Sequence, residues 1–361
     1  MYKRLVIIIA LSTFFLTGIG CGGNQGGASN EAGGALRVGL VADQGGVNDG
    51  SFNEAADRGI KKAEENLGIK RINPIESLQQ EQYQPNLKTM AGAADLTVGA
   101  GFIMASSMKA VSEQLPDKKF LIVDTIVDSP NVVSYVFKEQ EGAYLGGVMA
   151  GVLTKTNKIG FIGGKEGDVI ERFEAGFAAG VASVNPEAAK GLIPASANSH
   201  GAYVKYIDSF SDQSKAKEAA NILYNSGVDI IFHSAGGAGQ GLFLAAKERG
   251  KYAIGVDLDQ AKLLPDYGDV ILFSVIKKVD EAVFSAIENL QKGEFKGGST
   301  IKLGVKEDAI GISETLNKAV TDKAKDARTR AEEVVRSESL IIPDTLDKLL
   351  KFEAPSLKEA P

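Results

Sequence analysis

Cysteine, tryptophan and histidine are scarce in this chain of 361 residues, which holds one cysteine, no tryptophan and two histidines. A single cysteine cannot form an intrachain disulfide, and so few thiols and imidazoles argue against the usual cysteine- and histidine-rich metal sites. Neither His200 nor His233 lies in an HExxH motif, and DQGGVNDG at residues 43–50 lacks the carboxylate spacing of an EF-hand loop. We therefore expect no metal site and no cofactor.

The sequence motifs of common enzyme classes are also missing. Neither GFIGGKEG nor SAGGAGQG keeps the spacing of a phosphate-binding loop followed by Ser or Thr, and SAGGAGQG does not match GxGxxG. The chain contains no GxSxG elbow, and His233 lies in a predicted strand, where a buried imidazole with satisfied hydrogen bonds is expected. We expect a protein without enzymatic activity; paired carboxylates that assist glycosidic cleavage are the alternative.

Long apolar runs are limited to the N-terminus. Lys3 and Arg4 precede a nearly continuous apolar stretch at residues 5–20, which ends in small residues directly before Cys21. The stretch is shorter than the roughly 20 residues that a membrane-spanning helix needs. This pattern resembles a bacterial lipoprotein signal and predicts a signal peptide at residues 1–20, export to the bacterial cell envelope and lipidation of Cys21. A free or buried Cys21 thiol is the alternative.

Residues 22–35, GGNQGGASNEAGGA, have the composition of a flexible tether. We therefore expect a lipidated cysteine and linker at residues 21–35 and a globular part that starts near Leu36. About 320 residues remain, which suits two domains. Loss of the two signal cations changes the formal net charge from -6 to -8, which disfavours nucleic acid or anionic lipid as the main partner. A small-molecule ligand and a monomeric protein are the expectations.

Apolar runs typical of buried strands alternate with amphipathic helical stretches, which predicts an α/β fold with parallel sheets. The runs are LRVGLVAD, DLTVGAGF, KKFLIVDT, VVSYVF, KIGFIGG, YVKYIDSF, DIIFHSAG, YAIGVD and VILFSVIK. In open α/β sheets, ligands bind beyond the carboxyl ends of the strands. The residues at these ends are therefore the first candidates for a binding site: Asp43, Asp124, Phe210, Gly236, Asp257 and Lys277.

The first predicted strand-to-helix turn, VADQGGVNDGSFNEAADRGI, places an aromatic residue among glycines and polar residues. Ser51 and Glu54 fit a capping box, in which Ser51 caps the helix and Glu54 reaches back. Capping does not explain Phe52, for which we favour stacking on a ligand over packing in the core. Polar neighbours could join the site, although turn and cap roles explain them adequately: Asn48, Asp49 and Asn53.

Seven motifs stand in one order along the chain: GLVADQGGVNDGSFNEAA, FLIVDTIVDSPNVVSYVFKEQEGAYLGGVMAG, KIGFIGG, RFEAGFAAGV, VDIIFHSAGGAGQG, AIGVDLDQ and SVIKK. Together they resemble the basic membrane protein family of bacterial lipoproteins, which includes a purine nucleoside receptor. The resemblance runs from about Val38 to Ala282. It implies a lipid-anchored substrate-binding protein that captures nucleosides, in particular purine nucleosides, and presents them to an ABC permease. The implied fold is the two-lobed type I periplasmic-binding-protein fold, like that of ribose-binding proteins.

The resemblance also implies roles for individual residues around the base. Phe52 resembles the ring that stacks on the base, and Phe210 resembles its partner on the opposite face. Phe173, in RFEAGF, is a competing candidate for that second ring because it follows a glycine-rich turn. Asp43 resembles an acceptor at the base edge, and Asp124 matches a position near the sugar and the base edge.

Asp257 and Lys277 resemble the pair that binds the ribose hydroxyls, with the carboxylate accepting and the ammonium donating. A salt bridge between these two residues is the alternative. Gly236 and Gly237 would let the backbone approach the ligand, which a side chain at either position would prevent.

The implied fold predicts two lobes, each formed from separate parts of the chain. Lobe 1 is expected at residues 36–139 and 278–311, and lobe 2 at residues 140–277 and 312–361, whose tail includes a helix within NKAVTDKAKDARTRAEEVV and a short apolar LII segment. Two other functions stay open: a binding protein for a sugar or signalling molecule, and a surface adhesin or regulator on the same fold.

Overall fold

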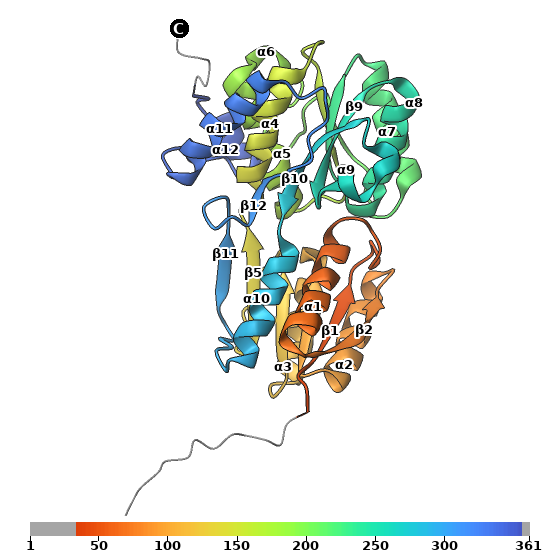
Figure 1. Cartoon of the computed structure of the whole chain (residues 1–361), viewed down its shortest axis with the longest axis vertical. Helices are drawn as coiled ribbons and strands as arrows, with labels where there is room; N and C mark the ends of the chain where they lie inside the picture. Colours follow the sequence, from red (N-terminus) through yellow and green to blue (C-terminus); the bar gives the residue numbers. More distant parts are fainter. Residues whose placement is uncertain (1–33, 356–361) are drawn as a thin grey trace, which may run out of the picture. The chain divides into compact units, whose positions relative to one another are not determined.

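Two six-stranded sheets organise the structure, a computed structural model that describes residues 34–355. Each sheet is flanked by helices, and the two form the two lobes that Figure 1 shows. The predicted signal peptide, Cys21 and most of the predicted linker lie outside the described residues. Within residues 34–355, no helix combines the length and the apolar character needed to cross a bilayer.

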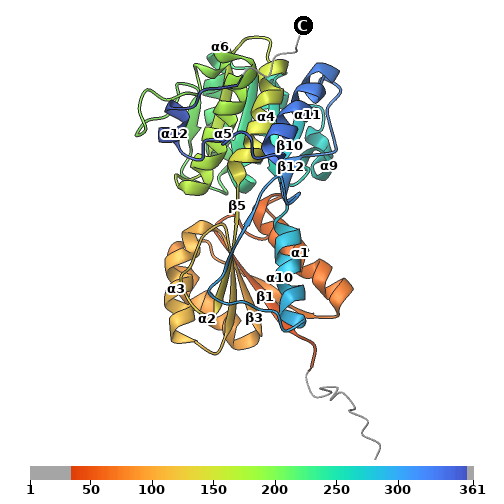
Figure 2. The ribbon, with the colours of Figure 1, turned by 90° about the vertical axis from the view of Figure 1, so that its left-hand side faces the viewer.

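Lobe 1 contains a wholly parallel sheet with the strand order β11-β5-β4-β3-β1-β2. Its strands are β1 (Arg37–Ala42), β2 (Lys70–Glu76), β3 (Leu96–Ala100), β4 (Lys119–Val123), β5 (Val132–Phe137) and β11 (Thr300–Leu303). Its helices are α1 (Phe52–Leu67), α2 (Tyr83–Ala93), α3 (Ala105–Gln114) and α10 (Val279–Gln291), with 3-10 turns η1 (Gln80–Gln82) and η2 (Phe102–Met104). Helices α1 and α10 cover one face of the sheet, and α2 and α3 cover the other (Figure 2).

Lobe 2 contains the second sheet, with the order β12-β10-β9-β8-β6-β7, in which only the β10–β12 pair is antiparallel. Its strands are β6 (Ile159–Gly163), β7 (Val204–Tyr206), β8 (Ile230–Ser234), β9 (Tyr252–Asp257), β10 (Ile271–Lys277) and β12 (Ile310–Ile312). Its longer helices are α4 (Glu139–Leu153), α5 (Asp168–Val184), α7 (Gln213–Asn225), α8 (Gln240–Arg249) and α11 (Asp322–Arg336). The short ones are α6 (Pro186–Ala189), α9 (Gln260–Leu263), α12 (Leu346–Leu350) and the 3-10 turns η3 (Gly236–Gly239) and η4 (Pro265–Tyr267).

The predicted α/β architecture with two lobes and parallel sheets is confirmed, and each of the nine apolar runs contains one strand. Three strands had no counterpart among the predicted runs: β2, β11 and β12. All three lie at an edge of their sheet. In β2, a half-buried strand that contains Pro74, polar and apolar residues mix because one side of the strand is not paired.

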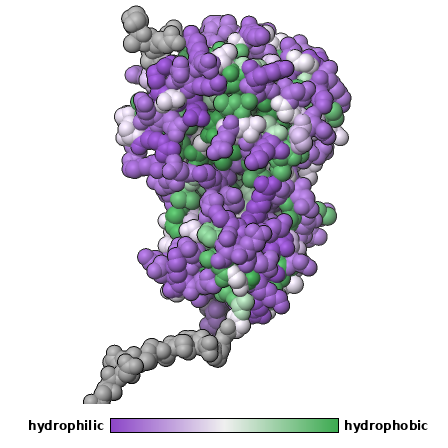
Figure 3. Space-filling model, in the orientation of Figure 1, coloured by the Kyte–Doolittle hydropathy of each residue, from purple (hydrophilic) through white to green (hydrophobic). Residues whose placement is uncertain are grey.

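Three segments connect the lobes: one between β5 and α4, one between β10 and α10, and one between β11 and β12. Strand β11 hydrogen-bonds into the sheet of lobe 1 and β12 into that of lobe 2. The exact lobe boundaries expected at residues 139, 277 and 311 stay predictions. Hydrophilic residues cover most of the face in Figure 3, and hydrophobic ones form smaller patches between them.

Helices α4 and α5 pack with their backbones unusually close. A Cβ atom added to Gly180 of α5 would lie 2.1 Å from the carbonyl oxygen of Tyr144, and one added to Gly147 of α4 would lie 2.2 Å from that of Phe177. Backbone atoms cannot move aside as the end of a side chain can. Glycine is therefore required at these two crossing points by lack of space.

We expect Gly180→Ala to lower the free energy of unfolding by about 1 to 3 kcal/mol, the usual cost of inserting a group into a filled core. Urea denaturation measures this change. Gly92→Ala in α2 is the matched control, because a Cβ there meets no atom within 4 Å and alanine favours a helix over glycine. Equal stabilities of the Gly180→Ala and Gly92→Ala variants would contradict the close packing of α4 and α5.

Candidate ligand-binding site

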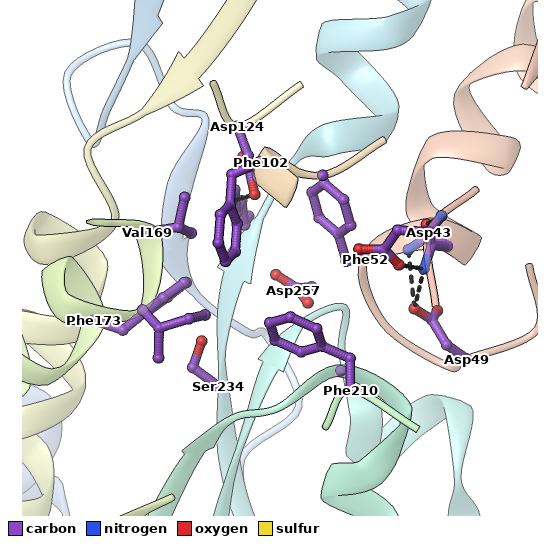
Figure 4. Close-up of a pocket in the computed structure, with 15 residues that line it drawn as sticks. Asp43, Asp49, Phe52, Phe102, Asp124, Val169, Phe173, Phe210, Ser234 and Asp257 are labelled. Carbon is purple, nitrogen blue, oxygen red and sulfur yellow. Dashed lines mark hydrogen bonds and ion pairs between the residues drawn. The ribbon is translucent and has the colours of Figure 1, made fainter. Parts of the chain in front are cut away.

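One cavity lies between the two lobes, at the carboxyl ends of strands from both sheets (Figure 4). The space between its lining atoms, including its open mouth, is about 450 Å³. All nine ligand-binding residues predicted from the sequence line it: Asp43, Phe52, Asn53, Asp124, Phe173, Phe210, Gly236, Asp257 and Lys277. Their direct contact with a ligand stays a prediction.

Two of the lining aspartates have a backbone conformation that is rare outside glycine. Asp124 follows β4 of lobe 1 with φ 75°, and Asp257 ends β9 of lobe 2 with φ 64°. Aspartate tolerates this left-handed region better than most residues, but the conformation still stores strain, which proteins concentrate at functional sites. One strained carboxylate thus enters the cavity from each lobe.

A buried network of charges surrounds Lys277. Its ammonium lies 2.5 Å from Asp124 Oδ2 and 2.9 Å from Glu139 Oε1, while Arg172 Nε contacts the other carboxylate oxygen of Glu139. The side chains of Lys277 and Glu139 are 1% and 0% exposed. The alternative salt bridge between Lys277 and Asp257 is wrong, because the ion pairs of Lys277 are with Asp124 and Glu139. Asp257 accepts a hydrogen bond from the hydroxyl of Ser51.

Burial and neighbouring charges act in opposite directions on these groups. Burial raises the pKa of Asp124 to about 7, although Lys277 works against the shift. Burial also raises the pKa of Glu139, but Lys277 and Arg172 overcome this and bring it below its usual value. For Lys277, burial lowers the pKa, but Asp124, Glu139 and Asp257 together raise it above the usual value. The ammonium therefore stays charged at neutral pH.

The cavity also offers a hydrogen-bond acceptor that the protein does not use. Asp124 Oδ1 is buried and has no hydrogen-bond partner. Buried polar atoms normally have one, so this oxygen is available to a ligand donor. Asp43, whose pKa burial also raises, accepts from the side-chain amide of Asn53 at 2.8 Å.

The loop before α1 differs from the predicted capping box. The Asp49 carboxylate, not the Ser51 hydroxyl, accepts the first free N–H groups of the helix, from Ser51 at 2.9 Å and from Asn53 and Glu54 at 3.1 Å. Glu54 does reach back, but to the N–H of the residue before Ser51. The Ser51 hydroxyl is thereby free to donate to Asp257 across the lobes.

Several rings face the cavity. The ammonium of Lys277 lies 5.2 Å from the ring centroid of Phe52 and 5.8 Å from that of Phe173. The Phe210 ring meets the edge of the Phe102 ring, with centroids 6.2 Å apart. Both candidates for the second stacking ring, Phe210 and Phe173, line the cavity, so the choice between them stays a prediction.

Sequence reasoning missed some lining residues: Gly101, Phe102, Val169, Ile170 and Ser234. Phe102 ends the predicted run DLTVGAGF and lies two residues after Ala100, the last residue of β3. The rule that selected the other strand ends would have found it. Val169 and Ile170 lie in the first turn of α5 and carry no comparable signal.

His233 is buried, as expected, but only one of its nitrogens has a partner: Nε2 lies 3.1 Å from Gln260 Oε1, and Nδ1 has none. Burial lowers the pKa of His233 to about 4, so the ring is neutral at physiological pH. Among residues 34–355, no group of His, Cys, Asp and Glu side chains is arranged to hold a metal ion.

Comparison with known proteins identifies the family. A family model described as ABC transporter substrate-binding protein PnrA-like matches residues 36–345. The chain belongs to this family. The sequence resemblance to basic membrane proteins is thereby confirmed, and the protein is a member of a family of ABC transporter substrate-binding proteins.

Relatives match nearly the whole PnrA-like chain. It is 38% identical to a CD4+ T-cell-stimulating antigen of Listeria innocua, over 92% of this chain and 95% of the relative. It is 32% identical to the ABC transporter nucleoside-binding protein BmpA of Lactococcus lactis, over 95% and 99%. It is 33% identical to basic membrane protein A of Borreliella burgdorferi, over 98% of each.

A similar solved structure is an ABC transporter solute-binding protein from Aeropyrum pernix, with a TM-score of 0.75 and 25% identity over 88% of this chain and 96% of that one. The predicted periplasmic-binding-protein fold is confirmed by this similarity.

Because burial raises the pKa of Asp49 to about 7, this group links stability to pH. Between about pH 4 and 7, folded Asp49 holds a proton that the unfolded chain has lost, so the free energy of unfolding falls as pH rises. Asp49→Asn should make this fall less steep, by up to about 1.4 kcal/mol per pH unit. Urea denaturation at several pH values tests this, with the exposed Asp128→Asn as the control. Parallel curves for wild type and Asp49→Asn would refute it.

Proposed function

We propose that this protein is the nucleoside-binding component of an ABC transporter, lipid-anchored in the bacterial cell envelope, and that purine nucleosides are its ligands. The observation that carries the proposal is that aromatic rings and a charged hydrogen-bonding group face one cavity between the lobes. A nucleoside needs both, because its base is flat and apolar on its faces and its sugar carries hydroxyls. The printed name of the Lactococcus relative, a nucleoside-binding protein, supports the same ligand class.

Phe52 from lobe 1 and Phe210 from lobe 2 are the proposed rings on either side of the base. Phe173 is 2% exposed and already packs against Phe232, with centroids 5.9 Å apart. Phe210 is only partly buried and keeps more ring surface for a ligand. Stacking of a base on an aromatic ring contributes about 1 to 3 kcal/mol. Asp43 would accept from a donor on the base edge.

Asp124, Asp257 and Lys277 are the proposed partners of the ribose. The unpartnered oxygen of Asp124 can accept from a hydroxyl or base donor, as can Asp257. An ammonium has three donors, and the two carboxylates beside Lys277 leave one for a hydroxyl oxygen. Hydrogen bonds to charged groups contribute about 1.5 to 3 kcal/mol each. Gly236, with φ 53°, brings backbone close to the ligand.

The remaining parts of the proposal concern presentation of the ligand. Lipid on Cys21 would hold the protein at the membrane, and the linker would let the lobes move away from the membrane surface. The permease would bind the closed, ligand-bound form of the monomer. Lobe 1 would comprise residues 36–139 and 278–311, and lobe 2 residues 140–277 and 312–361. This function requires capture and release, with no chemical change to the ligand and no cofactor.

Calorimetric titration tests the ligand class directly. The protein from Leu36 onward, unfolded and refolded to remove any retained ligand, is titrated with guanosine, inosine, adenosine, cytidine, uridine and ribose. We expect purine nucleosides to bind with micromolar or tighter affinity, about -8 kcal/mol or better, and ribose not to bind. Ribose binding without nucleoside binding would favour the sugar-binding alternative, and the absence of all binding would favour another ligand or an adhesin.

Phe52→Ala should weaken guanosine binding by about 1 to 3 kcal/mol, because it removes one face of the base clamp. The same titration measures the loss. Phe284→Ala is the matched control, since Phe284 is a partly buried ring of the same lobe that contacts Lys62 outside the cavity. Unchanged affinity of the Phe52→Ala variant would rule out stacking on this ring.

The anchoring proposal is tested by replacing the only cysteine. In cells fed labelled palmitate, we expect the wild-type protein to carry label and to sediment with membranes, and Cys21→Ser to lose both properties. Expression of the two forms is compared by immunoblot. Equal labelling of wild type and Cys21→Ser would show that the lipid is not attached through the thiol of Cys21.

A further inference from the structure

Phe102 lies beside the ligand cavity and two wider hollows. It lines the cavity of about 450 Å³ and also lines spaces of about 1240 and 970 Å³. The first of these includes Thr125, Lys138 and Lys302, and the second includes Lys165 and Tyr206. The ring of Phe102 is thus common to the ligand cavity and both hollows.

The Phe102 ring belongs to lobe 1 but rests on lobe 2. A Cβ added to Gly167 would lie 2.5 Å from Phe102 Cε2 and 3.0 Å from Cζ. Gly167 precedes α5 and has φ 160° and ψ 163°, an extended conformation that other residues also adopt. A Cβ at position 167 would therefore compete for space with the ring of Phe102, which would have to shift.

Phe102 also braces one of the proposed stacking rings. Its plane is at 86° to that of Phe210, with centroids 6.2 Å apart, which is the edge-to-face geometry that aromatic pairs favour. Figure 4 shows the Phe102 ring among those of Phe52, Phe173 and Phe210 around the cavity. One ring of lobe 1 thus touches two points of lobe 2, Gly167 and Phe210.

We infer that Phe102 is a further binding residue of this site, a cover that closes over the ligand from lobe 1 and uses Gly167 of lobe 2 as its seat. The inference rests on the proposed function. For a ligand to leave, the lobes must part and the ring must come off Gly167. The contact between Phe102 and Gly167 therefore sets the dissociation rate.

The test measures the dissociation rate of guanosine by stopped-flow fluorescence or competition for four proteins: wild type, Phe102→Ala, Gly167→Ala and the double variant. We expect Phe102→Ala to speed dissociation by about tenfold or more. Gly167→Ala should also speed dissociation, because the added methyl displaces the ring. In the Phe102→Ala background, Gly167→Ala should add little, since the ring that it displaces is gone.

Controls separate this cover from general damage. Ile103→Ala is the matched control, because Ile103 is the next residue and lines an outer hollow but not the ligand cavity. Thermal unfolding checks that each variant folds. If Phe102→Ala does not fold, Phe102→Leu takes its place, because leucine keeps apolar bulk but lacks the flat ring.

The outcomes distinguish this inference from the proposed function. If wild-type protein binds guanosine but Phe102→Ala releases it at the wild-type rate, the cover is wrong and the proposed function stands. If the effects of Phe102→Ala and Gly167→Ala on the dissociation rate are additive, the proposed contact between Phe102 and Gly167 is wrong. If wild-type protein binds no nucleoside, the proposed function fails and the inference fails with it.

Discussion

The buried ammonium of Lys277 is the interaction on which the site depends. An unpaired charge at 1% exposure would cost several kcal/mol, and two carboxylates from different parts of the chain offset that cost. Asp124 follows the end of β4 in lobe 1, whereas Glu139 begins α4 where the chain enters lobe 2. Lys277 itself is the last residue of β10, directly before the chain returns to lobe 1. The network therefore joins two of the three connections between the lobes.

The same network fixes the chemistry of the cavity. Arg172 and Lys277 together face Glu139, so that carboxylate is matched, whereas Asp124 and Asp257 share the remaining influence of Lys277. A cavity with an excess of carboxylates favours a ligand with several donors and no negative charge. Uncharged sugar hydroxyls and the N–H groups of a base meet this condition. A phosphate group would face several carboxyl groups at close range, so the cavity disfavours an anionic ligand.

Much of this arrangement could be predicted from the sequence because strand ends carry local signals. Long apolar runs identified nine strands, and their terminal residues identified six of the fifteen residues that line the cavity. Three of the four edge strands were missed: β2 has Pro74 and unpaired polar residues, and β11 and β12 have only four and three residues. The fourth, β7, is equally short but lies within the longer run YVKYIDSF. The cap of α1 was misassigned because Asp49 and Ser51 are both good capping residues. The hydroxyl of Ser51 donates instead to Asp257, which is more than 200 residues away in the sequence, and no local pattern reveals this partner. Glu139 and Arg172 lie on helices that look ordinary in sequence. Their pairing depends on how α4 and α5 pack, which no local pattern encodes.

Ligand binding and lobe closure share groups in this structure. The Ser51 hydroxyl of lobe 1 donates to Asp257 of lobe 2, and Gln260 of lobe 2 donates to the backbone carbonyl of Gly50 of lobe 1 at 3.0 Å. Asp257 is thus both a proposed ribose acceptor and a contact that holds the lobes together. A ligand shifts a conformational equilibrium only by its difference in affinity for the two states. The proposed partners of the base and the sugar come from both lobes, so all of them surround the ligand only when the lobes are closed. The difference in ligand affinity between the open and closed states therefore follows from the position of the site between the lobes.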